Sequence, residues 1–337
     1  MLDYLDIKES KILIVGNRSY KNLGDELILL GTIKVLLKER KHILIVSYDP
    51  TRLQHFLSQF IDTSHITFLT EIPKGPRSLR TYIKTKKRKE RKLRKKADAI
   101  IIGGGEILTE ENKNAYRYRL VSILPCLFKK ISIYLMGGIQ VPKKSINKYL
   151  FKVLLNKTKK IFARDFESVN ELKEVGFENA EFFMDTAFFS YDRRKIENGK
   201  PRLPAGRLKM EDKKYIIVNI NKNGEKFFDK IFADVQDYIQ QGYEIYFVPV
   251  SIGANKEYSD IFYYHELKYR LKQDATSLKL LKREADFKHF AEKVANAEIV
   301  ISTRLHLFLI ASFLNVKTKV YPYQKKILKM QKVIGNL

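Results

Sequence analysis

The sequence predicts an α/β protein with two doubly wound domains that face a cleft, and three observations carry this prediction. Short apolar runs such as KILIV and HILIV alternate along the chain with longer segments of helical periodicity. These runs are continuously apolar, which is typical of parallel strands covered on both faces. A polar stretch at 191–214 interrupts the series, and 337 residues suit two domains better than one.

The first half of the chain reads as an alternating series that ends near residue 190. We expect strands at 11–16, 42–47, 66–70, 97–105, 131–138 and 160–165. We expect helices at 25–39, 53–60, 116–128, 144–155 and 167–175, the last stopped by Gly176. This half is predicted to be an N-terminal domain, 1–190, and 191–214 a linker.

A second series follows the linker. We expect strands at 215–220, 243–251, within 275–281, at 297–304 and at 317–323, with helices at 227–241, 258–271, 286–296, 305–314 and 324–335. The predicted C-terminal domain is 215–320, and the helix in 321–337 is a candidate to pack back on the N-terminal domain.

Composition narrows the class of protein. The net charge is +26, and much of it lies in KTKKRKERKLRKK, 84–96. This favours anionic partners, although such a run is most often a solvated helix face, and it holds no aromatic residue to stack a base. Cys126 alone excludes a disulfide framework and indicates a reducing compartment, the cytoplasm. No signal peptide or membrane-spanning segment is expected.

Ligands of open α/β sheets bind beyond the carboxyl ends of strands, so the strand ends are where a site is expected. The first such junction, GNRSYKNLGDE, leads into a helix. Asn22, Gly24 and Asp25 are candidates for ligand contact there. Helix capping by Asp25 is an equally good explanation, and a carboxylate suits a sugar hydroxyl or proton transfer better than a phosphate.

Two further junctions are rich in glycine. Gly103, Gly104 and Gly105 precede Glu106, and three consecutive glycines suit a turn whose amides face a ligand at a helix start. The segment MGGIQVP, 136–142, is a weaker signal of the same kind.

The fourth junction, STRLHLFLIASF, carries two cationic groups. Arg304 and His306 follow an apolar strand and enter an apolar helix, where they could converge on one anion. A structural arginine paired with a carboxylate is the alternative. Arg164 leaves another strand in the same way, with Ser168 available to the next helix. No Walker loop, HExxH, GxSxG or metal-ligand spacing is present, so neither a metal nor a cofactor is expected.

Several segments, taken together, identify a resemblance. NLGDELIL, DAIIIGGGEIL, ARDFESVNELKEVG, MDTAF and ISTRLHLFLIASFLNV, in this order, resemble the polysaccharide pyruvyl transferase family over nearly the whole chain. The resemblance implies a fold like that of GT-B glycosyltransferases, with two Rossmann-like domains. It implies transfer of a pyruvyl group from phosphoenolpyruvate to a sugar of a cell-surface or extracellular polysaccharide, leaving a ketal and releasing phosphate.

The resemblance also implies site residues. Arg304, Leu305 and His306 match an Arg-Leu-His triplet implicated in donor binding, and Arg164 matches the arginine of an Arg-Asp-x-x-Ser pattern. Asn22, Gly24 and Asp25 match the N-terminal loop, and 103–105 matches the glycine turn. The chain departs from the family at MGGIQVP, at Asp185-Thr186-Ala187 and at Asn315-Val316-Lys317.

The expected chemistry follows from these positions. The carboxylate and phosphate of phosphoenolpyruvate suit Arg164, Arg304 and glycine amides. Our hypothesis is that His306 binds phosphate or acts as general acid, while Asp25 or Glu106 orients or deprotonates the acceptor. The acceptor is a saccharide and a candidate lipid-linked glycan, in which case 84–96 would contact the anionic inner membrane face.

Three alternatives remain at this point. A glycosyltransferase of the same architecture would take a nucleotide sugar, for which Glu257 and Tyr258 are the nearest candidate contacts. A nucleic-acid-binding protein driven by charge would bind with steep salt dependence and without need of Arg304. A family member with altered motifs would have lost activity.

Overall fold

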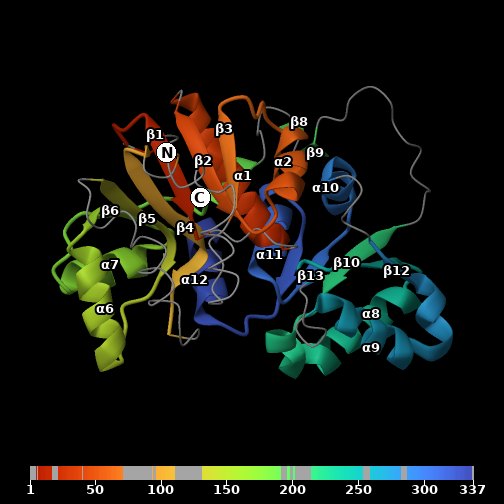
Figure 1. The fold of residues 1–337 in the computed structure, drawn as a ribbon. Helices are drawn as coiled ribbons and strands as arrows, with labels where there is room; N and C mark the ends of the chain where they lie inside the picture. The colour runs from red at the N-terminus through yellow and green to blue at the C-terminus, as the bar shows by residue number, and fades with distance from the viewer. Residues whose placement is uncertain are drawn as a thin grey trace, which may run out of the picture. The chain divides into compact units, whose positions relative to one another are not determined.

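The computed structural model describes residues 5, 7–16, 22–39, 41–70, 93, 96–110, 131–190, 196–197, 200–201, 214–252, 259–281 and 287–335. By the density of its internal contacts the chain divides into two compact units (Figure 1). The N-terminal unit comprises Met1–Tyr20 and Asp25–Ser190, and the C-terminal unit comprises Lys21–Gly24 and Tyr191–Leu337. The grouping of four residues near the N-terminus with the C-terminal unit differs from the simple boundary at residue 190.

The N-terminal unit is built on a seven-stranded parallel sheet of order β3-β2-β1-β4-β5-β6-β7. Its strands are β1 (Lys11–Val15), β2 (His42–Ser47), β3 (Ile66–Thr70), β4 (Ala99–Leu108), β5 (Ser132–Ile139), β6 (Thr158–Ala163) and β7 (Ala180–Phe182). Its helices are α1, which begins at Leu23 and ends at Lys38, α2 (Pro50–Ser58), α6 (Ser145–Leu155), α7 (Phe166–Glu174) and the 3₁₀ helix η2 (Thr186–Ser190).

The strands of this sheet are apolar throughout because, as the sequence indicates, both faces of the sheet are covered. Successive residues of β1 face opposite sides of the sheet, so Leu13 and Val15 belong to one core and Ile12 and Ile14 to the other. With both faces covered, an alternating polar position would be buried without a partner, and strand after strand is therefore apolar.

The C-terminal unit has a five-stranded parallel sheet of order β12-β11-β10-β13-β14. Its strands are β10 (Tyr215–Asn219), β11 (Glu244–Phe247), β12 (Leu278–Leu280), β13 (Val300–Ser302) and β14 (Thr318–Val320). Its helices are η4 (Lys222–Phe227), α8 (Phe228–Gln240), α9 (Asp260–Leu271), η6 (Lys272–Ser277), α10 (Phe287–Ala295), α11 (Leu305–Phe313) and α12 (Lys325–Gly335).

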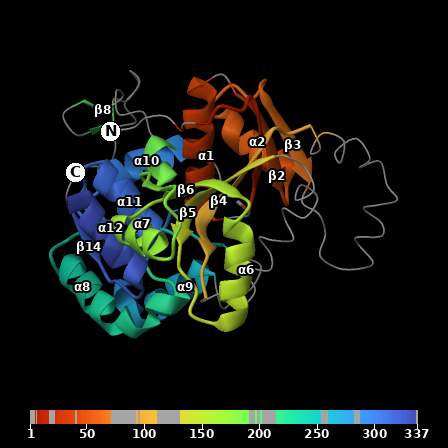
Figure 2. The ribbon, with the colours of Figure 1, turned by 90° about the vertical axis from the view of Figure 1, so that its left-hand side faces the viewer.

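Helices α8 and α9 lie side by side and cover one face of this sheet (Figures 1 and 2). Phe228 and Val235 of α8 share a core with Tyr263 of α9 and with the strand residues Val218 and Ile301. The helix α12 belongs to the same unit and contacts α11, and its packing on the N-terminal domain stays a prediction. A short antiparallel pair, β8 (Ile196–Glu197) with β9 (Lys200–Pro201), lies within the segment expected to be a linker.

The fold class is as predicted: two doubly wound α/β units with parallel sheets. One expectation was wrong. The strand β4 does not stop at its glycines but runs on to Leu108, whereas β5 ends at Ile139, within one residue of its predicted end. Several predictions lie outside the described residues. They are the helix 116–128 with Cys126, the contacts from Glu257 and Tyr258, and the run 84–96, of which only Leu93 and Lys96 are described.

An ion cluster in the N-terminal unit gives a pH-dependent contribution to stability. Burial alone would raise the pKa of Glu9, but hydrogen bonds from Ser132, Tyr134 and Lys159 outweigh it and lower this pKa from 4.5 to about 2. The Tyr134 hydroxyl lies 2.8 Å from Glu9 Oε2 and Lys159 Nζ 3.1 Å from Oε1. Because the folded pKa is the lower one, the carboxylate stabilises the fold above pH 4.5, and this contribution fades as the pH falls toward 2.

We therefore expect Glu9→Gln to lower the melting temperature at neutral pH and to have progressively less effect in acid. Calorimetry of wild type and variant at about pH 7, 5 and 3.5 measures this difference. Asp229→Asn, which removes an exposed carboxylate, is the control. A difference that stays constant over this range would contradict the assigned pKa.

Candidate functional site

The sheet of the C-terminal unit has one point where its strand order changes direction, between β10 and β13. The last residues of these strands, Asn219 and Ser302, pair in register. Polar residues follow both of them. Asn221 and Thr303 bond to each other, since the Asn221 N–H donates to Thr303 Oγ1 at 3.0 Å and that hydroxyl donates to Asn221 Oδ1 at 3.1 Å. Such a switch point is where open α/β sheets bind ligands.

Arg304 stands at this edge as the residue that precedes α11. Its N–H donates to Ser302 Oγ at 2.9 Å. Its guanidinium binds Asp260 twice, from Nη2 to Oδ1 at 2.6 Å and from Nε to Oδ2 at 3.3 Å. The Arg304 side chain is 22% exposed and Asp260 is fully buried. The arrangement is a bidentate, charge-assisted pair whose arginine reaches the surface.

His306 lies one helical position beyond Leu305 and is partly exposed. Leu305 is only 4% exposed, so its side chain belongs to the core and a ligand contact from it would have to come from the backbone. A helix start with Arg304 and His306 beside its first amides is a suitable environment for an anion.

The N-terminal motif lies in the same unit. Asn22 forms an antiparallel bridge with Ser251, and the Leu23 N–H donates to the Val250 carbonyl at 3.1 Å. The Gly24 N–H donates to Asn22 Oδ1 at 3.1 Å.

Gly24 packs directly on the histidine ring. A β-carbon added at Gly24 would lie 2.0 Å from His306 Nδ1. Two motifs from opposite ends of the sequence, Asn22–Gly24 and Arg304–His306, therefore meet within the C-terminal unit. Asp25 follows in the first turn of α1 and is partly exposed.

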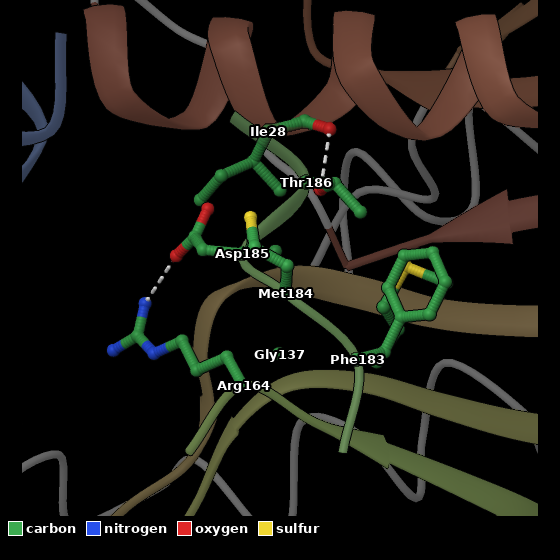
Figure 3. A pocket seen from close by; sticks show the side chains of 9 residues that line it. Ile28, Gly137, Arg164, Phe183, Met184, Asp185 and Thr186 are labelled. Atoms are coloured by element: carbon green, nitrogen blue, oxygen red, sulfur yellow. Dashed lines mark hydrogen bonds and ion pairs between the residues drawn. The ribbon is translucent and has the colours of Figure 1, made fainter. Parts of the chain in front are cut away.

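Arg164 lies at a separate cluster in the N-terminal unit. Its Nη1 is 3.1 Å from Asp185 Oδ2, and its Nη2 is 3.9 Å from Glu106 Oε1. The side chains of Arg164 and Asp185 are 4% and 3% exposed, and that of Glu106 is 26% exposed. Figure 3 shows the guanidinium turned toward Asp185. Glu106 is therefore the more exposed of the two acidic neighbours of Arg164.

The glycines of β4 and β5 make room for this buried arginine. Gly137 has a φ of 129° and packs so closely on β4 that an added β-carbon would lie 2.2 Å from the Gly104 carbonyl oxygen. One added at Gly138 would lie 2.9 Å from Arg164 Nη2. The prediction that Gly103, Gly104 and Gly105 form a turn before a helix is thus corrected: they belong to β4, and close packing explains the glycine pair opposite them.

A small cavity adjoins Arg164 (Figure 3). Its lining includes Gly104, Gly137, Arg164, Asp185 and Thr186. Its volume of about 10 Å³ is room for about one water molecule. This cavity is therefore too small to hold a substrate-sized anion.

Ser168 has a local role. It is 3% exposed. Its N–H donates to Asp165 Oδ1 at 2.8 Å and its hydroxyl to Asp165 Oδ2 at 2.9 Å. Asp165 is the N-cap of α7, so this pair of bonds is a helix cap. Capping accounts for Ser168 without a ligand.

Two acidic residues emerge only from the structure as partners of the arginines. Asp260 pairs with Arg304, and Asp185 pairs with Arg164. Both arginines are predicted to bind an anion, and the structure pairs each of them with a buried carboxylate of its own unit. The signal that could have found these carboxylates is physical: an arginine at a buried strand end requires an acidic partner.

Across the described ranges, no three His, Cys, Asp or Glu side chains gather in a way that could hold a metal ion. Over the same ranges, no helix is both long and apolar enough to cross a membrane.

Comparison with solved structures bears out the GT-B-like fold. The S. aureus MnaA–UDP structure superposes with a TM-score of 0.58 at 13% identity, covering 96% of this chain and 87% of that one. A glycosyltransferase from Rickettsia africae gives 0.55 at 14%, covering 93% and 79%. The UDP-GlcNAc 2-epimerase from Methanocaldococcus jannaschii gives 0.52 at 15%, covering 97% and 93%. At these identities the likeness concerns the fold alone.

A comparison with curated proteins found no match. The family model described as polysaccharide pyruvyl transferase matches residues 22–324, from the bridge residue Asn22 to the residue before α12. The match therefore includes both motifs that meet at the switch point and the Arg164 cluster. On this match, the chain belongs to the polysaccharide pyruvyl transferase family.

Proposed function

We propose that the protein transfers a pyruvyl group from phosphoenolpyruvate to two hydroxyls of a saccharide, forming a ketal and releasing phosphate. The observation that carries the proposal is the packing of Gly24 on His306, in the first turn of the helix that follows Arg304 at the switch point of the C-terminal sheet. A guanidinium, an imidazole and the first amides of α11 are hydrogen-bond donors suited to a small dianion. Family membership supplies the reaction class.

Each bond change in this reaction can be assigned. A proton adds to the methylene carbon of phosphoenolpyruvate, which becomes a methyl group, and positive charge develops at the neighbouring carbon. One sugar hydroxyl attacks that carbon and loses its proton. The second hydroxyl then replaces the phosphate, as the carbon–oxygen bond to phosphate breaks. Of the two hydroxyl protons, one balances the proton added to carbon and the other leaves with phosphate.

The side chains divide this work between them. His306 is suited to hold the phosphate or to supply a proton, because it lies in the first turn of α11, two residues after Arg304. The roles of Asp25 and Glu106 in orienting or deprotonating the acceptor stay predictions. Arg304 is the better candidate to bind phosphoenolpyruvate because its side chain is 22% exposed, whereas that of Arg164 is 4% exposed, and Arg164 is better placed to hold Glu106.

A phosphate-release assay with phosphoenolpyruvate and a panel of glycans tests the proposal. We expect release with at least one acceptor, and a strongly reduced but still measurable rate in Arg304→Ala. Arg270→Ala is the matched control, because Arg270 is an exposed arginine of the same unit whose partners are Asp229 and Glu266. Wild-type protein without release on any acceptor, or equal rates in both variants, would contradict the proposal.

A glycosyltransferase that uses a nucleotide sugar is the second candidate, because the S. aureus MnaA structure of the same fold is a complex with UDP. Thermal-shift measurements separate the two. We expect phosphoenolpyruvate to raise the melting temperature of wild type and not of Arg304→Ala. A shift with UDP-sugars alone would favour the second candidate. A lipid-linked acceptor, and a contact of 84–96 with an anionic membrane, remain predictions.

A further inference from the structure

Asp260 is the most heavily bonded carboxylate described in the C-terminal unit. It is the first residue of α9 and has no exposed surface. Five bonds reach it: from Asn219 Nδ2 at 3.0 Å, Val250 N at 3.0 Å, Ser251 N at 3.1 Å, Arg304 Nε at 3.3 Å and Arg304 Nη2 at 2.6 Å. The charge of the carboxylate is thus balanced by one guanidinium and three neutral donors.

These donors come from three neighbouring strands of the sheet. Asn219 ends β10, Val250 and Ser251 follow β11, and Arg304 follows β13. The strands β11, β10 and β13 are adjacent in this order. One side chain therefore joins the carboxyl ends of three parallel strands at the edge where the candidate site lies.

The network continues to the N-terminal motif. Ser251 forms the bridge with Asn22, and the Val250 carbonyl accepts from the Leu23 N–H. Gly24, next in the chain, packs on His306. Asp260 thus bonds Arg304 directly, and through Val250 and Ser251 it holds the segment that packs on the histidine.

A buried ion pair is weak evidence for a role in stability, because the desolvation of both charges offsets their attraction. Its bidentate geometry does define where the guanidinium lies and in which plane. We propose that Asp260 is a positioning residue: it fixes the Arg304 guanidinium and the Asn22–Gly24 segment in the arrangement that receives the anionic donor. This inference rests on the proposed function.

A double-mutant cycle with Arg304 tests it. In otherwise wild-type protein, Asp260→Asn should raise the KM for phosphoenolpyruvate by about tenfold or more, because the amide cannot hold the guanidinium as the carboxylate does. In the Arg304→Ala background, Asp260→Asn should alter the KM for phosphoenolpyruvate by less than about twofold, because the guanidinium that Asp260 positions is absent. A residue that only stabilised the fold would not show this dependence on Arg304.

Guanidinium ion offers a second readout. Added guanidinium should restore part of the activity of Arg304→Ala, because Asp260 can bind the ion in place of the missing side chain. It should not restore the Asp260→Asn/Arg304→Ala double variant. Rescue of both variants alike would overturn the inference.

The outcomes separate the two proposals. If wild type turns over phosphoenolpyruvate and Asp260→Asn keeps its KM, the positioning role is wrong and the proposed function stands. If wild type shows neither phosphate release nor a thermal shift with phosphoenolpyruvate, both are wrong. Asp229→Asn, an exposed carboxylate of the same unit, is the control for charge.

Asp260→Glu serves if Asp260→Asn does not fold, as judged by its melting transition. The glutamate keeps the charge and moves it by one methylene, so KM should still rise while the protein remains folded. A folded Asp260→Glu variant with the wild-type KM would overturn the positioning role.

Discussion

Arg164→Ala is expected to lower the free energy of unfolding by about 3–5 kcal/mol, the cost of removing one partner from a buried ion pair. The change leaves Asp185, with a side chain only 3% exposed, without its guanidinium. It also opens space beneath Gly138, whose backbone packs on Arg164 Nη2. Urea unfolding followed by circular dichroism, with the melting temperature as a second measure, tests this expectation.

Two comparisons make the Arg164 result specific. Arg270→Ala removes an exposed arginine with two acidic partners, and it should cost no more than about 1 kcal/mol. Combining Arg164→Met with Asp185→Leu replaces both charges by apolar groups, and it should recover much of the loss. A cost for Arg164→Ala as small as that for Arg270→Ala would show that the pair is not buried as described.

This expectation assigns Arg164 a different role from the one its sequence motif suggests. The sequence places it at the end of a strand, and the structure confirms that position at the end of β6. Sequence alone did not show that the guanidinium would be covered. Glycines beside a strand end are equally suited to a ligand and to a bulky buried side chain, since each requires the backbone to approach closely. At Gly138 an added β-carbon would lie 2.9 Å from Arg164 Nη2, which favours the second case.

The fold was more predictable than the site for a physical reason. Strands such as β1 and β10 are apolar throughout because both faces are buried, and that pattern is local in sequence. The end of α7 was likewise predictable from the sequence, because a glycine often follows the last turn of a helix. In the structure that glycine, Gly176, has a φ of 86°. The partners at the site are not local. Nothing near Asp260 in the sequence indicates that it would bond Arg304, and nothing near Gly24 indicates His306.

His306→Ala is expected to lower turnover by at least about 100-fold while leaving the fold intact, if the imidazole binds phosphate or transfers a proton. Gly24→Ala should have a comparable effect, because a β-carbon there would lie 2.0 Å from His306 Nδ1 and must displace the ring. The measurement is the turnover number at saturating phosphoenolpyruvate for each variant, at a temperature where each is folded.

The double variant decides whether the two residues act as one. If Gly24→Ala acts by displacing the imidazole, it should change turnover little in the His306→Ala background, because effects that pass through one group are not additive. Gly31→Ala is the matched steric control, since its added β-carbon would lie 1.6 Å from the Thr186 carbonyl oxygen, in the N-terminal unit. Its effect should combine independently with that of His306→Ala. If the effects of Gly24→Ala and His306→Ala are independent, the N-terminal motif contributes through a group other than the histidine. Asp25, the next residue in the chain, would then be the first candidate.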